Sequence, residues 1–83
     1  MNTCYRMVVR YDTNDSMYED DITQREEEFI GISFEDLSRQ LNEHPDVTKY
    51  TPGVSFTPEK LKNYRTTSGV RNYIVSIHEI KYN

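Results

Sequence analysis

The sequence has little cysteine, glycine and proline, no tryptophan and no long apolar run. Its one cysteine, Cys4, has no partner for an intramolecular disulfide, whereas small secreted domains usually carry several. The three glycines are isolated, which excludes a glycine-rich phosphate-binding loop. Residues 1–6 lack the apolar run of a signal peptide, and no stretch approaches the ~18 apolar residues that cross a bilayer. We therefore expect a cytoplasmic protein without membrane contact, located in the host cytoplasm if it is viral.

The chain is short and only moderately apolar. Its 83 residues predict one domain, residues 1–83, with a thin core, because a chain of this size buries only ~60–65% of its unfolded surface. Hydrophobic residues make up 35% of the sequence and include seven tyrosines and three phenylalanines. Tyrosine joins an apolar ring to a polar tip, so these residues either close a small core or coat a binding surface.

The first half of the chain predicts two strands and a helix. Apolar residues alternate with polar ones over residues 3–12, which is typical of a strand with one face on a core. A turn-forming cluster follows, and the apolar residues 29–32 predict a second strand antiparallel to the first. Ser33 has the character of a helix N-cap, and the helix is expected to end at His44–Pro45 because the residue before proline avoids the α region.

The second half predicts further strands and a second helix. Residues 47–50 and 54–56 have strand-like composition, and Thr57–Pro58 should begin a short helix that runs to about residue 65 and stops by Gly69. Residues 70–82 predict a strand that is apolar on both faces and therefore central. The expected fold is α+β, in the order β-β-α-β-α-β, with a small antiparallel or mixed sheet of about four strands and one or two short helices.

Charge is distributed unevenly along the chain. The net charge is −4, yet residues 12–36 hold ten acids and one base, which makes that segment −9 and the remainder +5. Alternate strand residues lie ~6.8 Å apart, close to two ~3.4 Å rises along a nucleic-acid strand. Glu26 and Glu28 would therefore share one face at a phosphate-like spacing. The candidate partner-binding face comprises Tyr18, Glu19, Asp20, Asp21, Glu26, Glu27 and Glu28. The alternative is a solvated charge run that only aids solubility.

A second candidate site is basic. Arg65 and Arg71 flank Ser68 and Gly69, so guanidinium and backbone N–H groups there could hold a phosphate or carboxylate. The alternative is a helix stop with arginines in solvent. Direct nucleic-acid binding is not expected, because phosphate repels an acidic chain at long range.

Catalytic and metal motifs are not evident. Neither His44 nor His78 lies near Cys4 in a pattern that indicates a nucleophile and its base. Asp12, Asn14 and Ser16 begin a calcium-loop pattern, which fails because Met17 and Thr23 replace the required glycine and glutamate. We therefore predict no enzyme activity, no metal and no cofactor.

Small acidic chains of this kind act mostly by binding. We expect an inhibitor or regulator that docks its acidic region on the basic groove of a nucleic-acid-handling protein, as a phage-encoded antagonist of a host defence system would. One alternative is an oligomeric protein that binds or sequesters a small phosphate-containing ligand. Another is an accessory subunit that joins a larger complex through an exposed sheet edge.

Overall fold

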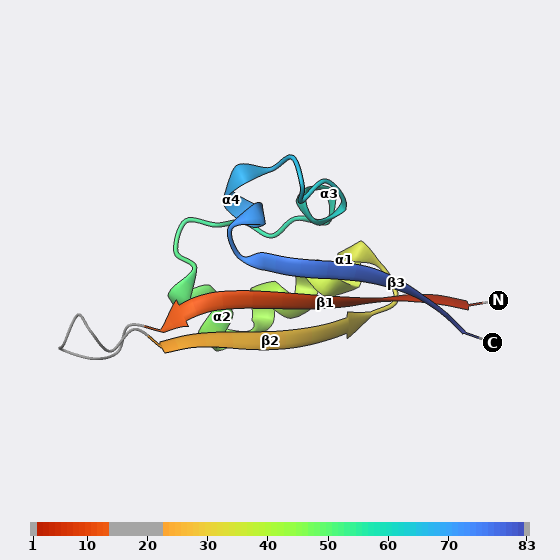
Figure 1. Ribbon diagram of the computed structural model, residues 1–83, viewed down its shortest axis with the longest axis horizontal. Coiled ribbons are helices and arrows are strands. Elements are labelled where there is room, and N and C mark those ends of the chain that lie inside the picture. Colours follow the sequence, from red (N-terminus) through yellow and green to blue (C-terminus); the bar gives the residue numbers. More distant parts are fainter. Residues whose placement is uncertain (1, 14–22, 83) are drawn as a thin grey trace.

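A computed structural model describes residues 2–13 and 23–82 (Figure 1). Three strands, β1 (Asn2–Thr13), β2 (Thr23–Gly31) and β3 (Ile74–Tyr82), form an antiparallel sheet in the order β2-β1-β3. Four helices lie between β2 and β3 in the chain: α1 (Phe34–Glu43), α2 (Pro45–Tyr50), α3 (Pro58–Lys62) and α4 (Ser68–Arg71). The predicted α+β class is confirmed.

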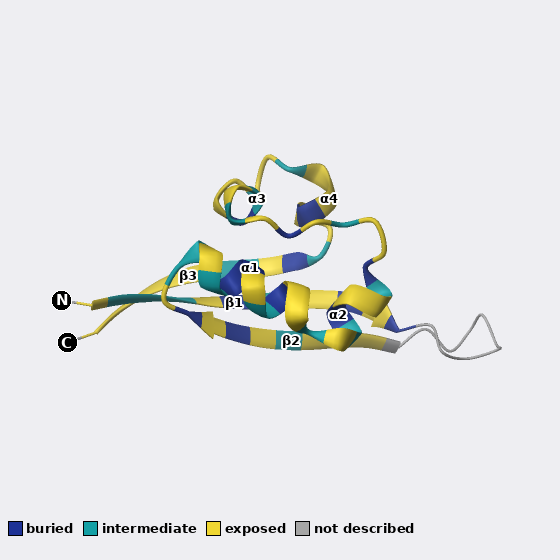
Figure 2. Cartoon of the chain, turned by 180° about the vertical axis from the view of Figure 1, so that it is seen from behind, coloured by how far each residue is buried: buried dark blue, intermediate teal, exposed yellow. Residues whose placement is uncertain are grey.

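The two faces of the sheet differ because strand side chains alternate. The inner face carries Met7, Val9 and Tyr11 of the central strand β1, and these side chains are buried together with Phe29 of β2. Figures 1 and 2 show α1 and α2 against this face. The outer face carries the intervening residues and is exposed, as Ile30 at 56% illustrates.

Local capping groups place α1 and α2. The Ser33 hydroxyl accepts the Asp36 backbone N–H at 3.1 Å, and the Asp36 carboxylate accepts the Ile32 N–H at 3.2 Å. His44 ends α1, and its Nδ1 then accepts the Val47 N–H at 3.3 Å at the start of α2. The predicted start at Ser33 and end at His44–Pro45 are confirmed.

The core closes where α1, α2 and the segment before α3 meet the inner face. Leu37, Leu41 and Val47 are completely buried, and Phe56 and Leu61 pack into the same cluster. The Ser38 hydroxyl donates to the Phe56 carbonyl, which ties α1 to this segment. The predicted cap of α3 is also confirmed, since the Thr57 hydroxyl accepts the Lys60 N–H at 3.2 Å.

Two of the predicted strand segments have other structures. Residues 47–50 belong to α2, because Pro45 opens a helical turn and Val47 is the residue that turn buries. Residues 54–56 are not a strand, and the Phe56 side chain is buried in the core. The described sheet therefore has three strands, and the prediction of four in the order β-β-α-β-α-β was wrong.

The last strand was also misplaced. It begins at Ile74, because Val70 lies buried in α4, and it is an edge strand rather than the central one. Its second apolar face is exposed to solvent, as Ile80 at 38% and Tyr82 at 46% indicate. Conversely, β2 is longer than predicted and includes the three consecutive glutamates 26–28.

Candidate functional site

The acidic candidate face falls into two parts. Tyr18, Glu19, Asp20 and Asp21 lie outside the described residues. Glu26, Glu27 and Glu28 lie on β2, where the antiparallel register places Glu26 opposite Arg10 and Glu28 opposite Val8. What the described part can do therefore depends on what β1 presents to these three carboxylates.

On the outer face, arginines of β1 pair with the two outward glutamates. Arg10 Nε lies 2.9 Å from Glu26 Oε1, and Arg6 Nη2 lies 2.8 Å from Glu28 Oε2. The hydrogen bond from Arg6 lowers the pKa of Glu28, and the same bond raises the pKa of Arg6. Glu26 and Glu28 share a face, but two guanidinium groups balance their charges there.

Glu27 points to the opposite, inner side of the sheet. It accepts a hydrogen bond from the Tyr11 hydroxyl at 3.2 Å, and its Oε2 lies 4.0 Å from His44 Nε2. Burial, followed by the charge of Glu27, raises the pKa of Tyr11, because both disfavour the phenolate. The three consecutive glutamates therefore do not form one acidic surface.

A further group of acids precedes Arg25 in the sequence. Residues 12–24 contain five acids and no lysine or arginine. Thr13 and Thr23 are paired across β1 and β2, so both ends of the segment that joins these strands attach at the same place. At this end Arg25 of β2 pairs with Asp46 of α2 at 3.5 Å.

The basic candidate set does not form a single cluster of contacts. Arg65 lies over the Tyr64 ring, 5.9 Å from its centroid, and a hydrogen bond to the Tyr64 hydroxyl raises the pKa of Arg65. Ser68, Gly69 and Arg71 form the exposed turn of α4, so a helix begins where we predicted one to stop. Among the described residues, Arg65 and Arg71 share no hydrogen-bond or ion-pair partner.

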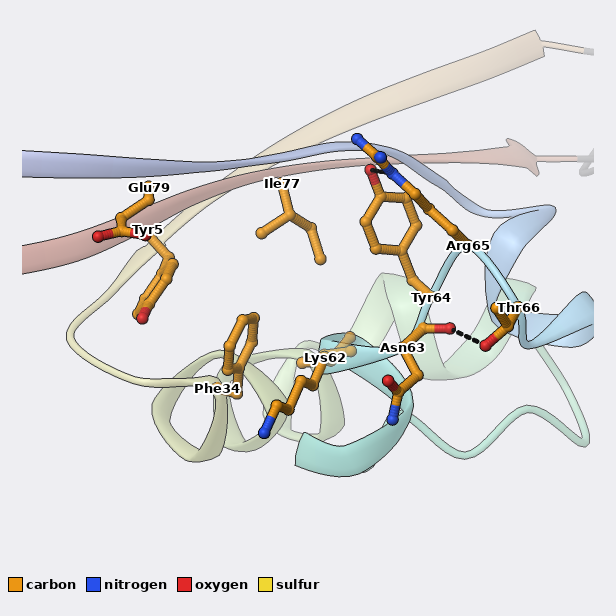
Figure 3. Close-up of a pocket in the computed structure, with 10 residues that line it drawn as sticks. Tyr5, Phe34, Lys62, Asn63, Tyr64, Arg65, Thr66, Ile77 and Glu79 are labelled. Atoms are coloured by element: carbon orange, nitrogen blue, oxygen red, sulfur yellow. Dashed lines mark hydrogen bonds between the residues drawn. The ribbon is translucent and has the colours of Figure 1, made fainter.

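Arg65 instead borders a groove beside β3 (Figure 3). The Tyr5 and Phe34 rings stack at one end of the groove, with centroids 4.7 Å apart, and Tyr64 faces them from the other. Its volume is about 420 Å³, and its lining residues are Tyr5, Phe34, Leu61, Lys62, Asn63, Tyr64, Arg65, Thr66, Ile77 and Glu79. A second hollow of about 560 Å³ shares Tyr5, Phe34 and Lys62 with this groove and extends past Glu35, Pro58 and Glu59.

This groove combines rings with charges of both signs. Lys62 and Arg65 supply two cations, and Glu79 supplies one carboxylate on the β3 side. Of the predicted basic residues, the groove includes Arg65 alone. The sequence has no local signal for Tyr5, Phe34 or Lys62, because they come from three elements that only the fold brings together.

Residues 2–13 and 23–82 contain no group of three or more His, Cys, Asp and Glu side chains placed to hold a metal ion. His44 uses Nδ1 to cap α2, and Cys4 is half-buried on β1 opposite Ile80. None of the described helices has the length and apolar character of a membrane span.

Comparisons with protein-family models, curated protein sequences and solved structures find no match to this chain. The surfaces of the described residues are therefore the basis for a proposed function.

Proposed function

We propose that this chain is a small binding protein that inhibits or regulates a partner by docking its acidic segment, residues 12–24, on a basic groove. The observation that supports this is the pairing of Glu26 with Arg10 and of Glu28 with Arg6. These pairs balance charge on the outer face, whereas residues 12–24 contain five acids and no lysine or arginine. The outward glutamates of β2 are thereby less suited to docking, and the acidic segment, residues 12–24, is the part that we propose to dock.

A segment with this concentration of acids suits a partner that normally binds nucleic acid. Basic grooves attract negative charge at long range, which raises the rate of encounter, and the attraction weakens as salt screens it. Docking there excludes the nucleic acid that the groove would otherwise hold. A phage-encoded protein that blocks a host nuclease would work in this way.

The test is an affinity capture that compares two charge-matched variants. The tagged protein is incubated with nuclease-treated lysate, and captured proteins are identified by mass spectrometry at low and high salt. We expect one basic, nucleic-acid-binding protein that is released by salt or by added duplex DNA. Replacing Glu19 and Asp21 with amides should abolish capture, while the control Glu26→Gln with Glu28→Gln, which removes the same two charges, should retain it. Capture that is lost only in the control variant would contradict the proposal.

The groove favours a second candidate, a small anionic ligand with an aromatic part. A volume of about 420 Å³ is within the range of ligand pockets, and Lys62 and Arg65 lie beside the rings of Tyr5 and Phe34. The test measures the binding of ATP and of inorganic phosphate by NMR, as chemical-shift changes in the protein. ATP binding that weakens in Lys62→Ala and Arg65→Ala but not in Lys60→Ala would favour this function. No shift with either probe would exclude these two ligands.

A further inference from the structure

The edge strand β3 has one side that no described strand covers, and part of this strand projects from the molecule. The order β2-β1-β3 gives β3 one strand neighbour. Figure 1 shows α3 and α4 beside the beginning of β3, whereas the end that leads to the C-terminus extends beyond them. There, the pairs from Asn2–Tyr82 to Cys4–Ile80 lie past the end of β2. A two-stranded ribbon is only marginally stable alone, and an open edge is a template for another strand.

This free edge, defined as residues 78–82, carries two opposite charges around an apolar residue. Glu79 and Lys81 are exposed, and neither belongs to an ion pair within the described residues. They point to the same face, because alternate strand residues do. Ile80 and Tyr82 point to the other face and are 38% and 46% exposed. The edge is therefore self-complementary in charge, with an apolar side chain at its centre.

The charges distinguish between the possible registers of two such edges. Antiparallel self-pairing is two-fold symmetric. Successive residues direct their N–H and C=O groups to opposite edges, so the axis lies midway between the two copies of one residue, which is called the residue on the axis. With Ile80 on the axis, Glu79 of each copy lies opposite Lys81 of the other. With Glu79 or Lys81 on the axis, like charges face each other.

A longer overlap is obstructed by the fold. With His78 on the axis, pairing would continue back to Ile74, where a register shift against Val8 and Val9 distorts the strand. Such irregularities blunt sheet edges, and α3 and α4 lie beside this part of β3 in Figure 1. Pairing is thereby confined to the projecting part of the strand.

We propose that two copies of this chain associate through the free edges of their β3 strands, antiparallel, with Ile80 on the two-fold axis and a Glu79–Lys81 pair on each side. This proposal is independent of the proposed function. The two three-stranded sheets become one continuous sheet. Five residues from each copy form a small interface, so the dimer is weak and forms at high protein concentration.

The dimer does not depend on a disulfide. Cys4 pairs with Ile80 one strand inward from the edge, so the Cys4 residues of two copies are separated by three strand spacings. Three spacings of ~4.8 Å place their backbones ~14 Å apart, beyond the ~7 Å that a disulfide spans. A reducing agent should therefore leave the association unchanged.

Charge reversal tests the register in the full chain. Sedimentation velocity over a dilution series from millimolar to micromolar protein should show a reversible monomer–dimer equilibrium that weakens as salt is added. Glu79→Lys and Lys81→Glu should each weaken dimerisation about tenfold or more, because each turns two attractive pairs into two repulsive ones. The double reversal should restore the wild-type dissociation constant to within about threefold. Glu59→Lys, an exposed reversal on α3, is the matched control and should have no effect.

Several outcomes would overturn the proposal. These are a chain that is monomeric throughout the series, single reversals that leave the dimer intact, or a double reversal that dimerises no better than the singles. Loss of the dimer on reduction would also overturn it. Circular dichroism of each variant shows whether it folds, and recovery in the double reversal separates a broken contact from a damaged fold.

Discussion

The inner and outer faces of this sheet are built from the same three strands but are stabilised differently. The inner face buries Met7, Val9 and Tyr11 beneath α1 and α2, so it is stabilised by removal of apolar surface from water. The outer face presents Arg6 and Arg10 paired with glutamates of β2, and roughly half of each of these side chains stays exposed. Exposed ion pairs contribute little to stability, so the fold depends on one face and the other face is available for contact.

The difference between the two faces shows why consecutive glutamates on a strand need not form one acidic surface. Along one strand the three glutamates are consecutive, but the pleat sends Glu27 to the inner side and its neighbours to the outer side. The partner strand then supplies Arg10 directly opposite Glu26, and Arg6 in the position diagonal to Glu28. The charge that a strand presents is a property of the pair of strands rather than of either sequence alone.

The largest expected effect is on the inner face. Leu41→Ala should cost about 2–5 kcal/mol, because it empties a fully buried position, and this approaches the total stability of a small domain. Ile30→Ala on the outer face should cost less than about 1 kcal/mol, because Ile30 is 56% exposed. Urea unfolding monitored by circular dichroism measures both. Equal losses in the free energy of unfolding would mean that both faces of the sheet are buried to the same extent in solution.

A smaller effect is expected at the buried hydrogen bond that joins α1 to the segment before α3. Ser38→Ala should cost about 1 kcal/mol, because it removes the buried hydroxyl that donates to the Phe56 carbonyl. Asn42→Ala is the control, since its amide lies 3.4 Å from the same carbonyl and its side chain is exposed. We expect it to cost less in the same unfolding experiment. A stabilised Ser38→Ala variant would contradict the role given to this hydrogen bond.

The outer ion pairs should contribute still less. A double-mutant cycle that replaces Arg10 and Glu26 with alanine should give a coupling of about 0.5 kcal/mol that shrinks in high salt. Both side chains are about half exposed, at 47% and 52%, so water screens their attraction. A coupling above about 2 kcal/mol would show that the outer face is desolvated in solution and therefore covered.

The smallest effect concerns acid stability at Glu28. The pKa of Glu28 is lowered by Arg6, so the pair stabilises the fold above the ordinary carboxyl pKa and loses this contribution as pH falls through the lowered value. Arg6→Gln should therefore be slightly less stable than wild type at neutral pH and equal to it in acid. NMR titration of the Glu28 carboxyl should return the ordinary pKa in this variant. An unchanged pKa would mean that the pair does not form in solution.

Local chemistry explains what the sequence could predict. Ser33 and Thr57 cap the helices that follow them, and Pro45 separates two helices, because each acts through neighbouring backbone groups. The first strand was also predictable, since its alternation reports one buried and one exposed face. The α+β class follows from these elements.

What could not be predicted depends on contacts between distant segments. Residues 47–50 have strand-like composition, yet the helix that starts at Pro45 includes them and buries Val47 against the core. The two apolar faces of residues 74–82 suggested a central strand, whereas one face is exposed at an edge. The groove joins Tyr5 with Phe34 and Tyr64 only after the sheet and helices pack.

The pairing of β1 with β3 also has a consequence for how the protein is made. The central strand is synthesised early, but its partners include residues as late as Tyr82, which is paired with Asn2. A ribosome must release nearly all of this sequence before Met7 can meet Ile77 and complete the sheet. Until then the apolar side of β1 is shielded only by β2 and the early helices. Contacts between distant parts of a chain slow folding, so we expect the sheet to be completed only after β3 has left the ribosome.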